Sequence, residues 1–267
     1  MPRVARLSIA PVRSLGLQHP RAVDLTPAGV VEDRRFYLVD ETGRFIDRTV
    51  IGRLVQVAAE TDAVASRLRL TFPDGEVVED DVWLGDAVTT EVYDRTAEGQ
   101  YVEGPWSDAL SAFAGRRLRL VRTVRPGGTR RSNAVSLVGD GSLAALARQA
   151  GVAAVDGRRF RMLIEIEGLG PHEEDGWIGG RVAIGETVLE ITKPTARCAI
   201  TTQDPDTGAR DLDTLRAIIG YRGLREGKKA DFGVLGEVVQ PGRVRVGDRV
   251  EAVPIDARAR EDRASRA

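Results

Sequence analysis

RCAITTQDPDTG, residues 197–208, is the most informative stretch of this 267-residue chain, because it contains the single cysteine, Cys198. We expect a strand over residues 187–191, a loop with a proline, and a second strand that begins at the cysteine. Arg197 and Lys193 are positively charged neighbours, which favour the thiolate, the form of cysteine that binds a soft metal. Free cysteine is also often buried, so a small core residue is an equal alternative.

The second half of this stretch has the composition of a tight turn. Asp204-Pro205-Asp206-Thr207-Gly208 combines residues that each favour turn geometry for a separate reason. Asp204 has two candidate roles here, a catalytic proton donor near a metal or the cap of the turn, and we favour the cap slightly.

The composition limits the chemistry that the chain can perform. One cysteine excludes an intramolecular disulfide, and it favours a reducing compartment. The two histidines, His19 and His172, lie far apart in the sequence, which excludes the usual Cys/His zinc cage. The net charge of -1 provides no global attraction to nucleic acid or to an anionic membrane. Without an apolar run of roughly 18 residues or a signal-peptide pattern, we expect a soluble, cytoplasmic protein.

Short apolar runs between Gly, Asp and Pro turns predict a mainly β protein with a few short helices. Hairpin turns are expected at residues 40–44 and 73–75. Helices are expected over 107–114, over 142–149 with Ser142 as N-cap and Gly151 after the end, and over 212–219. Further strands are expected over residues 4–9, 35–39, 54–58, 68–72, 90–93, 134–138, 160–165, 182–184, 188–191, 198–202 and 244–246.

A basic Pro-Gly-Gly segment at residues 122–131 has the composition of a linker. It predicts a β-barrel-like domain over residues 1–122 and a second β domain over residues 123–254. The charged tail over residues 255–267 has no apolar face, and we expect it to be frayed.

Residues 197–208 resemble the signature of MOSC domains, the molybdenum cofactor sulfurase C-terminal family. The segments RFR (159–161), EEDGWIG (173–179) and 241–248 resemble other MOSC segments and stand in the family's order. APVRSL (10–15) and GVVEDRR (29–35) resemble the β-barrel domain that precedes MOSC in some members. The resemblance runs from about residue 4 to residue 253, and it implies an N-terminal β-barrel domain followed by a MOSC β-barrel.

The two-domain members related to the mitochondrial amidoxime reducing component imply a bound molybdenum cofactor, Mo-molybdopterin, between the domains. In such a protein Cys198 would be the metal ligand. Arginines and small hydroxyl or amide donors suit the phosphate of a pterin, although each arginine also has an ordinary interpretation as a surface charge. The positions that match cofactor contacts of the family are Arg13, Ser14, Arg34, Ser132, Asn133, Arg161, Ala196, Arg197 and Cys198.

Three positions depart from the family pattern. Arg13 stands where the family often has lysine, and Ala196 replaces a frequent serine beside the metal ligand. Met162 and Leu163 stand where Pro-Asn is common. These differences affect the details of cofactor and substrate binding rather than the fold.

For this type of protein the resemblance implies an oxidoreductase that reduces N-hydroxylated small molecules, with the hard redox step carried by the cofactor. We see no cysteine-rich iron–sulfur module, so a separate electron-donor protein is expected. A non-catalytic carrier of the cofactor or of sulfur through Cys198, and a β-scaffold with a vestigial site, are the alternatives. Pyridoxal phosphate is linked to the family by name only, and no apolar pocket for a Schiff base is evident around Lys193, Lys228 or Lys229.

Overall fold

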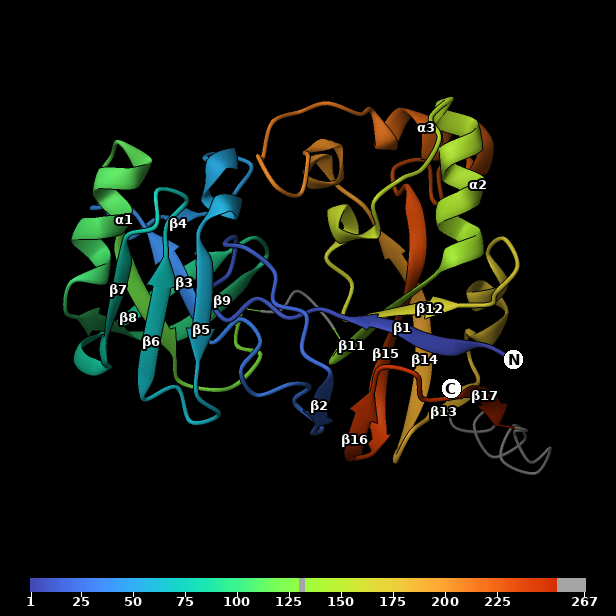
Figure 1. Ribbon diagram of the computed structural model, residues 1–267, viewed down its shortest axis with the longest axis horizontal. Helices are drawn as coiled ribbons and strands as arrows, with labels where there is room; N and C mark the ends of the chain where they lie inside the picture. Colours follow the sequence, from blue (N-terminus) through green and yellow to red (C-terminus); the bar gives the residue numbers. More distant parts are fainter. Residues whose placement is uncertain (130–132, 254–267) are drawn as a thin grey trace.

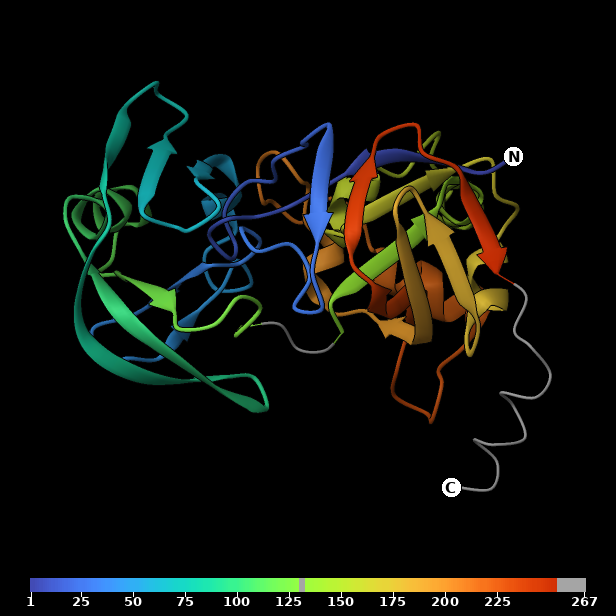
Figure 2. The same cartoon turned by 90° about the horizontal axis from the view of Figure 1, so that it is seen from below.

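The computed structural model describes residues 1–129 and 133–253. These residues form two β-rich lobes that lie side by side along the longest axis of the molecule (Figure 1 and Figure 2). The first lobe contains the strands β3 to β10, and the second lobe contains the strands β1, β2 and β11 to β17. Within the described ranges, no helix is both long and apolar enough to cross a membrane.

The first lobe is built from two antiparallel sheets and one helix. Its apolar side chains form a shared core that includes Phe36, Leu54 and Leu70, and α1 (Trp106–Ala114) adds the fully buried Trp106. The strands are β3 (Phe36–Val39), β4 (Phe45–Ile46), β8 (Trp83–Val92), β9 (Arg95–Glu103) and β10 (Arg119–Thr123) in the order β4-β3-β10-β9-β8, and β5 (Ala58–Thr61), β6 (Arg67–Thr71) and β7 (Val77–Asp81) in the order β5-β6-β7.

The second lobe is a seven-stranded sheet that nearly closes into a barrel. Its order is β1-β12-β11-β15-β14-β13-β17. A bridge between Arg3 and Arg249 and a hydrogen bond from the Val250 amide to the Pro2 carbonyl bring the two ends of the sheet together. The strands are β1 (Arg3–Leu7), β11 (Val135–Gly139), β12 (Ile164–Glu167), β13 (Arg181–Ile184), β14 (Thr187–Ala196), β15 (Asp231–Gln240) and β17 (Val250–Val253).

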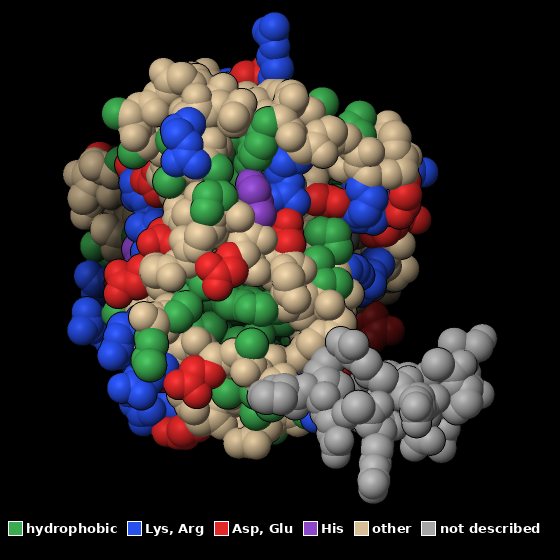
Figure 3. All heavy atoms as spheres, turned by 90° about the vertical axis from the view of Figure 1, so that its right-hand side faces the viewer, with side chains coloured by type: hydrophobic (Ala, Val, Ile, Leu, Met, Phe, Trp, Pro, Cys, Tyr) green, Lys and Arg blue, Asp and Glu red, His purple; other side chains and the backbone are tan. Residues whose placement is uncertain are grey.

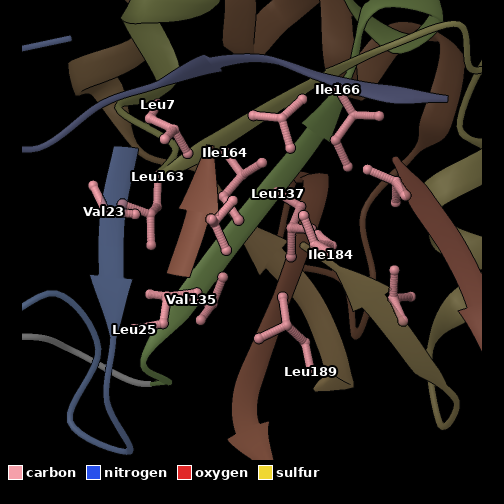
Figure 4. Packing of buried hydrophobic residues seen from close by; sticks show 14 of the residues in the cluster. Leu7, Val23, Leu25, Val135, Leu137, Leu163, Ile164, Ile166, Ile184 and Leu189 are labelled. Atoms are coloured by element: carbon pink, nitrogen blue, oxygen red, sulfur yellow. The ribbon is translucent and has the colours of Figure 1, made fainter. Parts of the chain in front are cut away.

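The interior of this barrel is filled by branched apolar side chains from strands that are distant in the sequence. Figure 4 shows Val23 and Leu25 from the N-terminal segment beside Leu163 and Val135, and Leu7 belongs to the same cluster. The segment joins the lobe because β1 pairs with β12, and β2 (Ala22–Leu25) pairs with β16 (Gly242–Arg245). Apolar packing in the second lobe therefore includes residues before position 31, while the division at residues 122 and 123 stays a prediction.

Two helices lie next to each other on one side of the barrel, α2 (Asp140–Ala150) and α3 (Thr214–Arg222) (Figure 1). The described part of the chain also forms four short 3-10 helices: η1 (Gly52–Gln56), η2 (Gly157–Phe160), η3 (Glu173–Trp177) and η4 (Ala199–Thr202). Over the end of the second lobe that faces away from the first, basic and acidic side chains are interspersed (Figure 3).

The predicted mainly β fold, both hairpin turns and all three helices are confirmed, with boundaries that shift by a few residues. Gly151 ends α2 with a left-handed φ of 68°. Ser142 is not the N-cap, because the helix begins earlier and the Ser142 hydroxyl donates to the buried Glu174 carboxylate instead. The tail over residues 255–267 lies outside the described residues.

Three predicted strands are wrong wholly or in part. Residues 54–58 fall largely on η1, residues 160–165 begin in η2 before β12, and residues 198–202 fall on η4. All three carry a β-compatible composition, but local hydrogen bonds close a tight turn instead. In η4, for example, the Thr201 amide donates to the Cys198 carbonyl.

Candidate functional site

A cavity of about 960 Å³ is lined by residues of both lobes. Among the residues that the structure describes, its walls carry three aspartates, Asp33, Asp47 and Asp94, against ten basic side chains. Because the whole chain has a net charge of -1, this concentration of positive charge is local, and it makes the cavity attractive to anions. The basic residues are Arg13, Arg34, Arg48, Arg95, Arg161, Lys193, Arg197, Arg225, Lys228 and Lys229.

Cys198 lies on the wall of this cavity and is exposed. Strand β14 continues to Ala196, two residues before the cysteine, with irregularities in its pairing at Lys193 and near Pro194. The chain then turns, and Cys198 becomes the N-cap residue of η4. The alternative that the cysteine is a small core residue is therefore wrong, because its thiol is presented to the cavity.

Arg197 points back into the second lobe from beside the thiol. Its guanidinium donates to the Phe160 carbonyl and to the Met162 sulfur, which is 3.3 Å away. Burial lowers the pKa of Arg197 to about 10, while the charge of Cys198 acts in the opposite direction. The side chain thus anchors the segment that carries Cys198.

Strained backbone is concentrated around the cavity. Among the described residues, eight that are not glycine have a positive φ, and five of these eight line the cavity. Each such conformation costs about 1–3 kcal/mol, and clusters of them mark functional sites. The five residues are Ser14, Arg34, Tyr93, Asn133 and Arg161. All of them except Tyr93 were predicted from the sequence as cofactor contacts.

Arg161 adopts a left-handed φ of 51° directly after η2, and one of its terminal nitrogens donates to the Leu15 carbonyl at 2.8 Å. The other terminal nitrogen, Nη1, is buried and has no hydrogen-bond partner in the ranges that the structure describes. Burial lowers the pKa of Arg161 well below its usual value, and the charges of Arg48 and Arg34 add to this effect. The open Nη1 is a donor that an anion in the cavity can use.

Arg13 and Arg34 reach the same cavity from the first half of the chain. Arg13 lies over the rings of Phe45 and Tyr93, with its Cζ atom 5.5 Å and 5.2 Å from the two centroids. Arg34 forms an ion pair with the buried Asp33. Both guanidinium groups are therefore held in place by neighbours, as a preformed anion site requires.

Arg48 belongs to the site, but the sequence analysis missed it. Its side chain lines the cavity although the residue is only 1% exposed. The Nε atom donates to Gln203 Oε1 at 2.7 Å, and Gln203 Nε2 donates to the Arg48 carbonyl at 2.8 Å. Burial and the charge of Arg159 lower the pKa of Arg48 to about 10, against the opposing charges of Asp204, Asp47 and Cys198. The only sequence signal is its position just after the hairpin strand Phe45–Ile46.

Comparison with known protein families gives two matches that together cover almost the whole chain. The MOSC N-terminal beta barrel domain matches residues 1–113, and the MOSC domain matches residues 115–251. This chain belongs to the MOSC family. The predicted family and fold class are thereby confirmed.

Curated relatives of this MOSC protein include mitochondrial amidoxime-reducing component 1 of Mus musculus, which is 36% identical over 103 residues. That match covers 36% of this chain and 30% of the relative. Molybdenum cofactor sulfurase of Caenorhabditis briggsae is 26% identical over 88% of this chain and 33% of its own length. The chain thus spans about a third of the length of these relatives. The crystal structure of the YUAD protein of Bacillus subtilis also matches this chain, with 13% sequence identity and a TM-score of 0.48. The match covers 96% of this chain and 98% of the YUAD chain.

The remaining predicted contacts of the MOSC protein divide into three cases. Ala196 is exposed and lines the cavity. Asn133 also lines it, although its side-chain amide donates to Thr192 and Glu237 at 2.7 Å each. Ser132 lies outside the described residues.

Asp204 occupies the turn rather than the cavity wall. Its Oδ1 atom accepts hydrogen bonds from the amides of Asp206 and Thr207 and from the Thr207 hydroxyl. Burial alone would raise its pKa, but the hydrogen bonds from Thr207 hold the pKa of Asp204 below its usual value. A carboxylate that stays ionised is a poor proton donor, so the geometry favours the turn cap over the catalytic role.

The side chains of the MOSC site fit an anionic cofactor that brings its own metal ligands. No group of three or more His, Cys, Asp or Glu residues that could hold a metal occurs in the part of the chain that the structure describes. The exposed thiol of Cys198 on the cavity wall is the protein ligand that a soft metal held here would take, and the cofactor would supply others. The open guanidinium nitrogens of Arg48 and Arg161 suit the phosphate of such a cofactor.

Proposed function

We propose that this protein binds a molybdenum-pterin cofactor in the cavity between its lobes and reduces N-hydroxylated small molecules. Cys198 would be the ligand of the metal, and a separate protein would supply the electrons. The observation that carries the proposal is the exposed thiol on the wall of a strongly basic cavity in which Arg48 and Arg161 have buried terminal nitrogens without partners within residues 1–129 and 133–253.

Residues of both lobes would hold the cofactor. Arg161, Arg13 and Arg34 are placed to bind a phosphate with charge-assisted hydrogen bonds, which are about twice as strong as neutral ones. Arg197 would keep the Cys198 segment in position through its bonds to the Phe160 and Met162 region. When bound, the cofactor would supply two-electron chemistry at molybdenum.

The names of the relatives support the choice of substrate class. The amidoxime-reducing components match this chain at 36% identity over 103 residues in the mouse protein. Reduction of an amidoxime consumes two electrons and two protons, and it yields an amidine and water. We therefore take amidoximes and related N-hydroxylated compounds as the substrates to test.

A carrier of the cofactor or of sulfur is the second candidate. The buried carboxylates on the cavity wall are already engaged, since Asp33 pairs with Arg34 and Asp47 accepts hydrogen bonds from Thr49 and Tyr93. A carrier needs the thiol and the anion site, but it needs no acid and no electron-donor partner. The similarity to molybdenum cofactor sulfurase is compatible with this role.

Turnover of the loaded protein distinguishes the two candidates. The chain is produced in a host that makes the cofactor, and a chemical reductant is supplied together with benzamidoxime. Amidine formation by the wild type and its loss in Cys198→Ser are the expected results. Bound molybdenum without amidine would favour the cofactor carrier, and wild-type protein without molybdenum would overturn both the reductase and the cofactor carrier.

A further inference from the structure

Arg48 is buried at a place where an ionised side chain needs a partner. It is 1% exposed, yet neither Nη1 nor Nη2 has a hydrogen-bond partner among the residues described. A buried charge without a partner is unfavourable, and the usual solution in proteins is an ion pair with several hydrogen bonds. Because Arg48 lines the cavity, a ligand inside it would lie against this buried charge.

The orientation of Arg48 is fixed by the other lobe. Gln203 accepts from Nε and donates to the Arg48 carbonyl, so the two residues exchange a pair of hydrogen bonds. With Nε occupied, the edge formed by Nη1 and Nη2 remains open. Two parallel N–H donors match an anion that presents two oxygen atoms.

Direct contact between the lobes sets the distance from Arg48 to the cysteine segment. A Cβ atom placed on Gly208 would lie 2.0 Å from the Gly52 carbonyl oxygen, and one placed on Gly52 would lie 2.4 Å from the Gly208 oxygen. The backbones of η1 and of the turn after η4 therefore touch where only glycine fits. Arg48 lies just before η1, and Cys198 lies just before η4, so the contact brings the segments of these two residues together.

Arg48 lines the same cavity as the Cys198 thiol and the predicted phosphate arginines. The charge of Cys198 raises the pKa of Arg48, and the charge of Arg48 lowers the pKa of Arg161. A ligand on Arg48 would thus lie close to both the sulfur and the other arginines.

We propose that Arg48, held by Gln203, is an anion-binding site beside Cys198 that takes a carboxylate or phosphate group through two oxygen atoms. The inference rests on the cavity of the proposed function, but the site needs no molybdenum, so it can be tested on metal-free protein. The anion has two possible sources, the phosphate of a bound cofactor and the acidic group of a free substrate.

The site is tested with inorganic phosphate on metal-free protein by isothermal titration calorimetry. Arg48→Gln should weaken binding about 10-fold or more, because two charge-assisted hydrogen bonds are lost. Arg35→Gln is the matched control, since Arg35 is 7% exposed and is absent from the cavity wall. It should change the affinity less than about 2-fold. Equal phosphate affinity in the wild type and Arg48→Gln, or no binding by the wild type, would overturn the proposal.

A second variant keeps the test decisive if Arg48→Gln does not fold. Gln203→Glu places a carboxylate against Arg48 Nε, where an internal ion pair should compete with added phosphate and weaken its binding several-fold. Gln203→Met, which lacks the carboxylate, should weaken binding less. Wild-type affinity in folded Gln203→Glu, with folding checked by thermal unfolding, would also contradict the site.

Two further measurements separate the sources of the anion. If the cofactor's phosphate occupies Arg48, Arg48→Gln should lower the molybdenum content, and molybdenum-loaded wild type should no longer bind free phosphate there. If a substrate acid is the ligand, loaded protein should still bind benzoate, and Arg48→Gln should weaken that binding. Failure of the proposed function would appear as absent molybdenum, and it would leave the metal-free titration unaffected.

Discussion

The arginines of one short segment, residues 158–161, differ in whether a carboxylate pairs with them. Arg158 donates to Asp206 at 2.7 Å and 2.9 Å, and Arg159 donates to Asp211 at 2.7 Å and 2.6 Å. Two residues later, no carboxylate pairs with Arg161 in the described ranges, and its terminal Nη1 atom is buried without a partner there. Hydrogen bonds to carboxylates raise the pKa of Arg158 and Arg159, whereas burial lowers the pKa of Arg161.

This difference separates structural charges from charges that are left open for a ligand. Outside the cavity the fold supplies a carboxylate for each of these arginines, and inside it Arg48 and Arg161 keep open donors. Unpaired buried charge lowers stability, and it persists where function requires it. The comparison therefore predicts that paired and open arginines respond differently to the same substitution.

The open arginines depend on the backbone contact between Gly52 and Gly208, which joins the two lobes. Gly208→Ala tests this contact. We expect a loss of about 3 kcal/mol or more in the free energy of unfolding, from the left-handed backbone plus the clash with Gly52. Gly151→Ala is the control, because Gly151 has a similar φ of 68° and nothing within 4 Å of the added carbon. It should cost about 1 kcal/mol. Equal losses in urea unfolding would show that the contact contributes nothing.

Methionine substitutions compare a paired arginine with an open one directly. Arg159→Met should lower the free energy of unfolding by about 1–2 kcal/mol, because the charge-assisted hydrogen bonds to a partly exposed Asp211 are lost. Arg161→Met in metal-free protein should change it by less than about 0.5 kcal/mol, or raise it, because burial of the open charge is relieved. Urea unfolding measures both, and a larger loss for Arg161→Met would reverse the interpretation.

Acid should reduce the stability that the ion pair between Arg159 and Asp211 contributes. The hydrogen bond from Arg159 holds the pKa of Asp211 below its usual value. A carboxyl whose pKa is lowered by folding adds stability above its unfolded pKa and loses it as the pH falls through the folded pKa. The stability difference between wild type and Arg159→Met should therefore shrink by about 0.5 kcal/mol between pH 6 and pH 3. A constant difference over this range would contradict the pairing.

Local sequence signals predicted the elements that depend on local physics. The Asp40 turn forms because its carboxylate accepts from the Thr42 and Arg44 amides, and Gly151 ends α2 in a left-handed conformation. The strand predicted at Cys198 is wrong, because the composition of residues 198–202 suits either a strand or a tight turn. The local hydrogen bonds of this segment form the turn. The entry of β1 into the second lobe depends on a partner about 160 residues away.

The candidate site was predictable only where family resemblance identified it. Arg13, Ser14, Arg34 and Arg161 were named from matching motifs, and the structure brings all four to the cavity wall. Arg48 has no distinctive neighbours in the sequence, and its importance depends on burial and on Gln203, which lies 155 positions away. Such a contact cannot be read from spacing along the chain.

Molybdenum content tests the central claim most directly, because that claim assigns the metal to one sulfur atom. Wild-type protein and Cys198→Ser are purified from a host that makes the cofactor, and their metal is quantified by mass spectrometry. The account predicts near-stoichiometric molybdenum in the wild type and almost none in a Cys198→Ser protein that is equally well folded. Equal molybdenum in the two proteins, or none in either, would contradict it.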